Sequence, residues 1–342
     1  MARTARVSAM TVSNVINGKF DGMTEQTRKL IEQAIAELGY RPDLVARGLR
    51  KGQRFSVGML IVDRSPRFLA DPWITNLVAG VSNYLNERNY SVLLHGAEAA
   101  KVSKISMLRN VVTDGLLVLL SGPVEERNEV LSHLQGLRQP IILFQGGVSK
   151  ALEDVCIVRQ DDFGGAFALT EMLLAHALRR IITLTSDWPW PALEERERGI
   201  RKAIEQSGRS LEQDVVKCPE NDFRAIGEAL KTYVDEKGFP DLILAANDQM
   251  GIAAMQHIRR LGANIPQDVM VTGFNAFDFW QYSETPLTTV RSPAYRVGGD
   301  GAAKLLERLQ TGKFEQGEFV LPVEIQLGET TRPVSRQSSG RS

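Results

Sequence analysis

From Phe55 onward the chain repeats one pattern, in which short apolar runs alternate with longer segments whose apolar residues recur every three or four positions. The longer segments, such as 77–89 and 224–238, predict amphipathic helices. The apolar runs predict strands at 57–62, 91–94, 115–120, 141–144, 156–158, 181–185, 241–246 and 269–274. Such alternation predicts parallel sheets covered by helices, and its length suits either a barrel or two doubly wound lobes. Sheets of this kind bind ligands at the carboxyl ends of their strands.

The first 40 residues have a different pattern, that of short helices separated by turns. A first helix that starts near Ser8 carries one apolar face, formed by Val12, Val15 and Ile16. Thr24 is placed to cap a second helix, which Gly39 ends. The apolar positions of this second helix, which predict one face, are Leu30, Ile31, Ala34, Ile35 and Leu38.

Two polar segments flank the repeating region. Residues 41–54 read as a linker, in which a short helix from Asp43 to Arg50 is weakened by Gly48 and would be marginal in isolation. We expect this linker to fold on binding a partner. Residues 331–342 have no core-forming periodicity and are predicted to be a disordered tail.

The totals are those of a globular protein: 342 residues, 43% hydrophobic and 24% charged. No apolar run approaches the ~20 residues needed to cross a bilayer, and there is no apolar signal region, so we predict a cytoplasmic protein. The net charge of zero is uneven, because residues 1–54 hold ten Lys or Arg and five Asp or Glu. This basic head favours a polyanionic partner, the alternative being a chance excess of solvated charge.

Candidate chemistry outside the head is sparse. Cys156 and Cys218 lie in strand-like runs at a spacing that matches no zinc or redox motif, and are expected to be buried and inert. The four histidines are scattered, and neither G-x-G-x-x-G nor G-x-x-x-x-G-K-[ST] occurs. We therefore predict no metal, no cofactor and no enzymatic activity.

The polar face of the first helix has the side chains expected of a helix that reads DNA. Short residues let a backbone approach a groove closely, and hydroxyls and amides donate to phosphate oxygens. The candidates for phosphate contact are Ser8, Thr11, Ser13 and Asn17. The candidates for base contact are Ala9, Met10 and Asn14, since Asn pairs with adenine and Ala or Met touches a thymine methyl. The alternative is a capped surface helix with no partner.

The residues beyond the first helix decide between these alternatives. The head reads RVSAMTVSNVINGK, then TEQTRKLIEQAIAELGYRPDLVARGLR. It resembles the DNA-binding head of the lac-repressor/galactose-repressor family of bacterial transcription regulators, with its helix-turn-helix pattern V-S-x-x-T-V-S-x-V-[LI]-N-G followed by E-L-G-Y-x-P and A-R-x-L. The segments AANDQMGIAAM, PQDVMVTGF and TPLTTVRSP resemble the family's ligand-binding core. The resemblance runs from residue 2 to about residue 330.

The resemblance implies a small all-α helix-turn-helix head (1–40), a hinge (41–54) and a two-lobed, periplasmic-binding-protein-like core (55–330). Lobe 1 would hold about 55–160 and 290–320, and lobe 2 about 161–289 and 321–330. It implies a homodimer on a near-palindromic operator and a sugar-like effector between the lobes. The tail lacks the leucine-repeat helix of the family's tetramers, so a dimer is expected.

The resemblance also implies that the hinge enters the minor groove, where Leu49 would wedge between base steps. Val45 and Ala46 would face the partner's hinge, and DNA contacts would also come from Thr24 and Arg47. The alternative for Leu49 is an ordinary buried linker residue.

The opening of the family's first helix, I-x-D-V-A-x-x-A-G-V-S, is matched only at its end, and Met1 falls on the family's valine. We expect the natural start to lie upstream, a GTG valine codon having been taken as the start. The alternative is a truncated first helix with weakened DNA binding, and a stop codon directly before codon 1 would support it.

By resemblance, the effector cleft would be lined by Trp73, Asp161, Arg196, Phe223, Asn247, Asp248 and Asn275. Asn275 departs from the family, which has aspartate there. Losing a carboxylate beside Arg196 makes the expected pocket more positive and favours an acidic or phosphorylated ligand. In the loop DWPWP, Trp188 or Trp190 would shape the entrance.

The sequence therefore predicts a ligand-responsive transcription regulator, most simply a repressor, that binds DNA and not a membrane. The alternative is a solute-binding or sensor protein with impaired DNA binding. An enzyme on an α/β scaffold is disfavoured, since no nucleophile elbow, metal cluster or phosphate loop is found.

Overall fold

The computed structural model describes residues 2–16, 18–39, 53–110, 112–146, 152–278 and 282–333. The chain forms two compact units, Met1–Phe55 and Ser56–Ser342, each of which is described by itself. The first is the head and the second is the core. In the described part of the chain, no helix has the length and apolar character needed to cross a membrane.

The head contains two helices, α1 (Ala9–Ile16) and α2 (Glu25–Glu37). The Ser8 hydroxyl accepts a hydrogen bond from the Thr11 amide (3.1 Å), and Thr24 caps α2 as predicted by accepting one from the Thr27 amide (3.3 Å). The buried core of the head consists of Ala5, Val12, Val15, Ile31 and Ala34.

The prediction of one apolar face on α2 holds only in part. Ile31 and Ala34 are buried, but Leu30 is 49% exposed and Leu38 is 53% exposed. The reason is size: α1 and the turn before it cover only a narrow strip of α2, so the edges of its apolar face remain in solvent.

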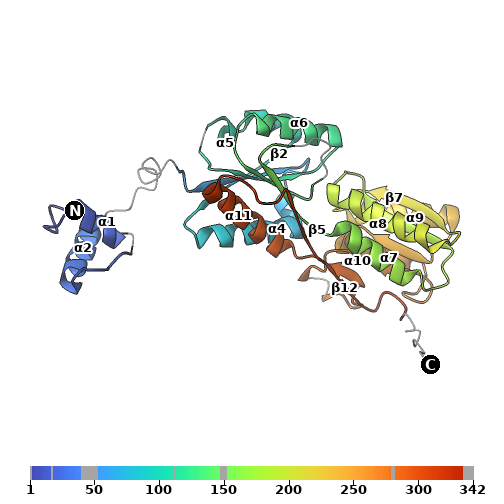
Figure 1. The fold of residues 1–342 in the computed structure, drawn as a ribbon. Helices are drawn as coiled ribbons and strands as arrows, with labels where there is room; N and C mark the ends of the chain where they lie inside the picture. The colour runs from blue at the N-terminus through green and yellow to red at the C-terminus, as the bar shows by residue number, and fades with distance from the viewer. Residues whose placement is uncertain are drawn as a thin grey trace, which may run out of the picture. The chain divides into compact units, whose positions relative to one another are not determined.

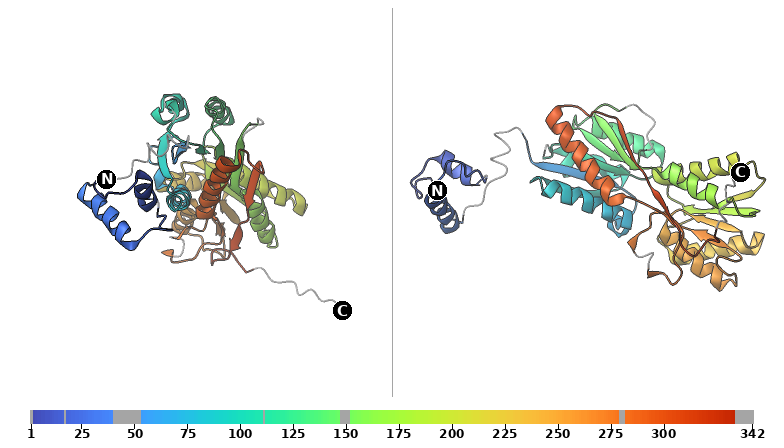
Figure 2. Two further views of the ribbon diagram at one scale, coloured as in Figure 1. Left: turned by 60° about the vertical axis from the view of Figure 1, so that its left-hand side comes forward. Right: turned by 60° about the horizontal axis from the view of Figure 1, so that its bottom comes forward.

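The core contains two parallel sheets, each with helices on both faces (Figures 1 and 2). We call the six-stranded sheet and its helices lobe 1. Its strands, in the spatial order β11-β5-β4-β3-β1-β2, are β1 (Ser56–Val62), β2 (Ser91–Ala97), β3 (Leu116–Leu120), β4 (Ile141–Phe144), β5 (Val155–Gln160) and β11 (Glu318–Leu321). Its helices are η1 (Phe68–Ala70), α4 (Pro72–Asn86), η2 (Ala99–Lys104), α5 (Ser106–Arg109), α6 (Val124–Gln135) and α11 (Ala294–Thr311).

Alternate residues of β1 show how the sheet is covered. Met59 and Ile61 join one apolar cluster with residues of α4 and α11, whereas Leu60 and Val62 join another with residues of η2 and α6. Since successive side chains of a strand point to opposite faces, both faces of this sheet are buried, which explains its nearly continuous apolar sequence.

We call the four-stranded sheet and its helices lobe 2. Its strands, in the order β7-β6-β8-β9, are β6 (Arg180–Ser186), β7 (Glu212–Cys218), β8 (Leu242–Ala245) and β9 (Met270–Thr272). Its helices are α7 (Asp162–Leu173), α8 (Pro191–Ser207), α9 (Phe223–Lys237) and α10 (Asp248–Arg260). An antiparallel pair, β10 (Thr289–Arg291) with β12 (Glu324–Gln326), packs on α7.

The chain crosses between the lobes three times: after β5, between β9 and α11, and between β11 and β12. The predicted fold class, a small helical head with a two-lobed core of parallel sheets, is confirmed. The hydrophobic pattern did not predict β10, β11 and β12, because they have only three or four residues and are partly exposed.

Helices α4 and α11 approach each other unusually closely because of two glycines. A Cβ at Gly80 would overlap the backbone oxygen of Tyr295, and one at Gly298 would overlap the backbone oxygen of Leu77. The neighbouring Gly299 has no such constraint, since its Cβ would lie 3.8 Å from the nearest atom, the Gly80 oxygen. The two helices are therefore packed backbone to backbone at one contact point.

We predict that Gly298→Ala destabilises the core by about 1–3 kcal/mol, since the added methyl forces two helix backbones apart. Gly299→Ala is the matched control and should be neutral or stabilising by up to about 1 kcal/mol, because alanine favours the helix. Thermal unfolding followed by circular dichroism measures both. Equal melting temperatures for the two variants would contradict the close packing.

Candidate functional site

The exposed face of α1 carries the side chains predicted to read DNA. Val12 and Val15 are buried in the head, whereas Ser8, Ala9 and Ser13 are exposed and Met10 is 74% exposed. Thr11 and Asn14 are half-buried at the edge of this face. The helix thus presents short side chains, most of them polar, and one long apolar side chain, Met10, to solvent, an arrangement that suits a groove of DNA.

Three of the predicted DNA-contact residues also have structural roles. The Ser8 and Thr11 hydroxyls lie 2.8 Å apart at the start of α1, and Thr24 caps α2. Asn17, Arg47 and Leu49, together with the linker residues Val45 and Ala46, lie outside the described residues.

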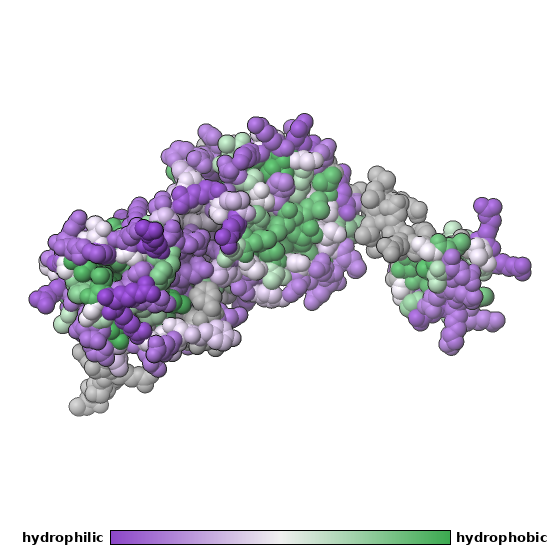
Figure 3. Space-filling view, turned by 180° about the vertical axis from the view of Figure 1, so that it is seen from behind, coloured by the Kyte–Doolittle hydropathy of each residue, from purple (hydrophilic) through white to green (hydrophobic). Residues whose placement is uncertain are grey.

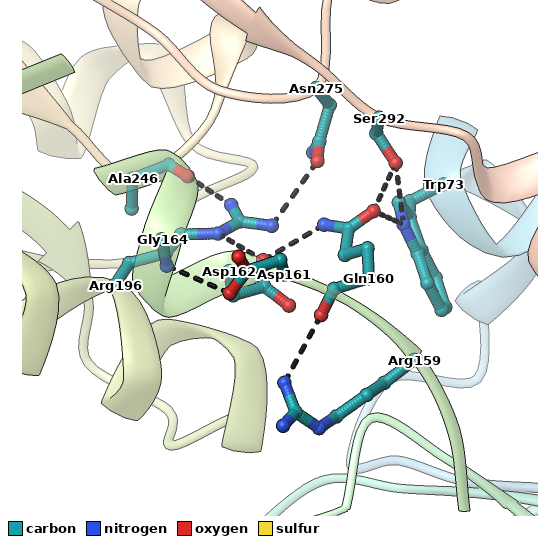
Figure 4. Close-up of polar contacts among 10 residues, drawn as sticks. All are labelled: Trp73, Arg159, Gln160, Asp161, Asp162, Gly164, Arg196, Ala246, Asn275 and Ser292. Carbon is teal, nitrogen blue, oxygen red and sulfur yellow. Dashed lines mark hydrogen bonds and ion pairs between the residues drawn. The ribbon is translucent and has the colours of Figure 1, made fainter. Parts of the chain in front are cut away.

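Arg196 of α8 is the centre of the predicted effector region (Figure 4). Its side chain is 8% exposed, and its Nε lies 2.8 Å from a carboxylate oxygen of Asp162. The other guanidinium nitrogens donate to the backbone oxygen of Ala246 and to Oδ1 of Asn275 (3.2 Å), and the guanidinium stacks on Phe274. All of these contacts are made within lobe 2 and its crossing segments.

The structure corrects the expectation that Asn275 leaves the region more positive. The carboxylate missing at position 275 is supplied by Asp162, which comes directly after the first crossing of the chain. Burial raises the pKa of Asp162, and the Arg196 guanidinium opposes that shift together with a hydrogen bond from Gln160 (2.8 Å). Arg196 is therefore already neutralised, so its charge gives no reason to expect an acidic ligand.

Trp73 links lobe 1 to two crossing segments. Its indole nitrogen donates to Gln160 (3.2 Å) and to the hydroxyl of Ser292 (3.1 Å), and the Ser292 hydroxyl also donates to Gln160 (Figure 4). The Trp73 side chain is buried, with 5% of the residue exposed. In this conformation its ring is packed inside the protein and is not open for stacking on a ligand.

Three other predicted ligand residues act as helix caps or internal acceptors. Asp161 caps α7 by accepting from the Gly164 amide (2.8 Å), and Asn247 caps α10 by accepting from the Met250 amide (2.9 Å). Asp248 is fully buried and accepts from the Thr289 hydroxyl and the Phe277 amide. Burial raises the pKa of Asp248 to about 7. Both Asn247 and Asp248 come after β8, at the carboxyl edge of its sheet, where the fold class predicts a ligand site.

A cavity of ≈ 210 Å³ opens between the lobes beside this network. Its apolar walls are Phe68 and Ile74 from lobe 1 and Trp188 and Trp190 from lobe 2. Its charged lining consists of Asp63, Arg64, Arg67, Asp71 and Glu220. Aromatic walls with a few polar groups are typical of a small-molecule site.

Glu220 is one of several cleft residues that the sequence pattern did not predict, together with Asp63, Arg64, Arg67, Phe68 and Asp71. Glu220 lies just after β7, accepts from the Asn247 amide group (3.0 Å) and from the Trp190 indole, and faces Asp63 and Asp71 of lobe 1. Burial, reinforced by those two carboxylates and opposed by Arg196, raises its pKa to about 7. Its position just after a strand, at the carboxyl edge of a parallel sheet, is the signal that could have found it.

Phe223, predicted to pack on the ligand, lies elsewhere. It is 42% exposed at the start of α9, with its ring 4.3 Å from that of His257 and the Arg260 guanidinium 5.3 Å away. These residues line a separate groove between α9 and α10. None of the seven predicted ligand residues is among those that line the inter-lobe cavity.

Residues 187–194, which we call the strap, reach from lobe 2 to lobe 1. Asp187 pairs with Arg64, the Trp188 indole donates to Ser121 (2.9 Å), and the Pro189 oxygen accepts from the Gly122 amide (2.9 Å). Glu194 receives two 3.0 Å hydrogen bonds from Arg127, whose side chain is 1% exposed. Since Trp188 and Trp190 also line the cavity, the strap both joins the lobes and forms a wall between them.

The predicted inert cysteines are confirmed as free and buried. Among the residues that the structure describes, no cluster of metal-ligating side chains occurs.

Comparison with known proteins matches both units of the chain. Residues 1–43 match the family of bacterial regulatory proteins, lacI family, and residues 170–331 match the periplasmic binding protein-like domain. Among curated proteins, the chain is 26% identical over 338 residues to the HTH-type transcriptional repressor PurR of Vibrio vulnificus (98% of both chains). It is 28% identical over 332 residues to the HTH-type transcriptional regulator CelR of Thermobifida fusca (96% of both chains).

Solved structures agree on the fold. A complex of the transcriptional regulator CelR with cellobiose has a TM-score of 0.72 and 27% identity, over 96% of this chain and 98% of that one. A lac repressor dimer bound to operator and the anti-inducer ONPF has a TM-score of 0.79 and 23% identity, over 96% of this chain and 97% of that one.

We predict that Asp162→Asn lowers the stability of the core by about 3 kcal/mol or more, because it leaves the Arg196 charge buried without its carboxylate. Adding Asn275→Asp should restore much of that loss, since position 275 already contacts the same guanidinium. Urea unfolding measures the change.

The matched control for this prediction is Glu228→Gln, which removes an exposed pair with Arg224 and should cost less than about 1 kcal/mol. If the double variant is as unstable as the two single changes added together, positions 162 and 275 do not share one charge site.

Proposed function

Because the chain belongs to the lacI family of bacterial regulatory proteins, we propose that it is a ligand-responsive transcription regulator, in the simplest case a repressor. It binds a palindromic operator as a homodimer and a sugar-like effector in the inter-lobe cleft. The observation that carries this proposal is the presence, in one chain, of the exposed polar face of α1 and of a cavity between two lobes. Relatives that align over nearly the whole chain are named as transcriptional repressors and regulators, which supports it.

The proposed mechanism is linkage between lobe closure and DNA binding. The cavity has walls from both lobes, so a ligand that fills it binds a closed core differently from an open one. The ligand shifts the equilibrium by that difference in affinity and by no more. The linker that joins head and core carries the shift to the DNA.

The homodimer is expected to form through lobe 1. Figure 3 shows a broad apolar area on the surface of this lobe. The edge strand β2 exposes Leu93 (39%) and Leu94 (36%), and Leu69 of the adjoining η1 is 45% exposed. Phe68 of η1 packs against Gly96 of β2, so these elements form one continuous surface. An apolar surface of this kind on an edge strand favours a protein partner, here a second copy.

Selection from randomised duplex DNA at stated low salt tests the function, because phosphate contacts make affinity depend on salt. We expect an enriched palindrome. In the same selection Met10→Ala should relax the preference at one base pair in each half-site, because it removes an apolar contact to a base. The discrimination lost there should not exceed about 1–3 kcal/mol, the usual cost of one mismatched base pair.

Leu38→Ala is the matched control, since Leu38 is also an exposed apolar residue of the head but lies at the end of α2. It should leave the selected sequence unchanged. No enriched sequence from a folded dimer would contradict DNA reading and would favour a solute-binding sensor.

A separate prediction concerns the dimer. Leu93→Glu should shift the chain to monomer at micromolar concentration, because it introduces charge into the expected interface. Val215→Glu is the control, since Val215 is 54% exposed on β7, the edge strand of the other lobe, and should leave the dimer intact. Light scattering measures both, and a Leu93→Glu dimer of unchanged stability would contradict this interface.

A further inference from the structure

The cleft cavity has an unusual balance of charge. Three carboxylates, from Asp63, Asp71 and Glu220, line it together with the guanidiniums of Arg64 and Arg67. Arg64 is already paired with Asp187 of the strap. Arg196, the other cation close to Glu220, is paired with Asp162 outside the cavity lining. The cavity therefore offers carboxylate acceptors in excess of unpaired cations.

Internal hydrogen bonds use only part of these acceptors. Oδ1 of Asp71 caps α4, accepting from the amides of Trp73 (2.7 Å) and Ile74 (3.2 Å). Asp63 accepts from Ser65 and Ser121, which are both in lobe 1. Glu220 accepts at Oε2 from Asn247 and also accepts from the Trp190 indole. Each carboxylate has about four acceptor positions, so acceptor capacity remains toward the cavity.

The carboxylates also come from opposite lobes. Asp63 and Asp71 belong to lobe 1, and Glu220 belongs to lobe 2, so closing the lobes brings like charges together. That repulsion opposes closure unless a proton or a ligand donor lies between the carboxylates. The strap contacts favour closure. A ligand bound among the three carboxylates can therefore decide whether the lobes close.

Resting on the proposed function, we propose that the effector is recognised as a hydrogen-bond donor, a neutral or amino-bearing polyhydroxyl compound and not an anion, and that Glu220 is the residue that determines this preference. Hydroxyl or ammonium groups bridge Glu220 to the carboxylates of lobe 1. The aromatic side chains Trp188, Trp190 and Phe68 cover the apolar faces of the effector's sugar-like ring.

The test uses matched sugars: glucose, glucosamine and glucuronate, and galactose, galactosamine and galacturonate. Thermal shift and tryptophan fluorescence report binding, since two tryptophans line the cavity. We expect binding only from neutral or amino members. Glu220→Gln should weaken that binding about tenfold or more, as expected for loss of a charge-assisted hydrogen bond, and reduce discrimination against the acids. Glu236→Gln, an exposed carboxylate of α9, is the control and should change nothing.

A second readout needs no ligand. With the lobes arranged as in this structure the pKa of Glu220 is about 7, raised first by burial and then by Asp71 and Asp63 of lobe 1. Bringing those carboxylates toward Glu220 therefore favours its protonated form, and closure is coupled to uptake of a proton below pH 7. The groups facing Glu220 are Asp63, Asp71 and Arg196, and Arg64 and Arg67 share the cavity. Small-angle scattering should show the core closing as the pH falls through 7. The dependence of closure on pH should be smaller in Glu220→Gln. Asp248, whose pKa is also about 7, is present in both proteins and does not account for the difference.

Tighter binding of an acid than of its neutral match would overturn the proposal. If none of the six sugars binds, the pH readout decides: identical scattering profiles for the natural chain and Glu220→Gln overturn it. The DNA selection is independent of both, so a chain with this sugar preference but no operator would refute the regulator and leave the cleft assignment standing.

Discussion

The core depends on the buried ion pair between Arg196 and Asp162. Arg196 extends from α8 and holds the segment after β5 through Asp162, the end of β8 through Ala246, and the second crossing through Asn275. A buried charge is stable only where its partners are fixed, so the pair requires all three segments to keep one arrangement. One guanidinium thus fixes two of the three crossings on the side of lobe 2, and Gln160, Trp73 and Ser292 extend this network into lobe 1.

Two kinds of contact meet at the cleft and oppose each other. The strap draws the lobes together through the Arg127–Glu194 pair and the Trp188–Ser121 hydrogen bond, while the carboxylates of the cavity repel across the same gap. An equilibrium between two such terms is easily shifted by a small ligand, because only the difference between them has to be changed. This balance gives the proposed regulator a physical switch in its core.

Much of the fold could be predicted from the sequence, because helix and strand periods are local properties. Most predicted strands and the Thr24 cap appear as expected, and the family resemblance located Arg196. The exchange of charge between positions 275 and 162 could not be predicted, because it depends on two segments meeting in space. Glu220 was missed and Phe223 lies outside the cavity for a similar reason: they are three residues apart, and only the turn into α9 decides which one enters the cleft.

The glycine contact between α4 and α11 has a mechanical consequence. Helix α4 begins at the cavity beside Asp71, and α11 begins where the chain enters lobe 1 from the second crossing. Since their backbones touch at Gly80 and Gly298, these helices cannot slide or bend relative to each other without a clash. Lobe 1 is therefore expected to rotate as a rigid body. The far end of this rigid body is the start of β1, one strand length or about 20 Å from the carboxyl edge of the sheet. Lobe 1 is therefore a lever arm: a slight rotation at the cleft becomes a larger sideways displacement at Ser56, where the chain arrives from the head.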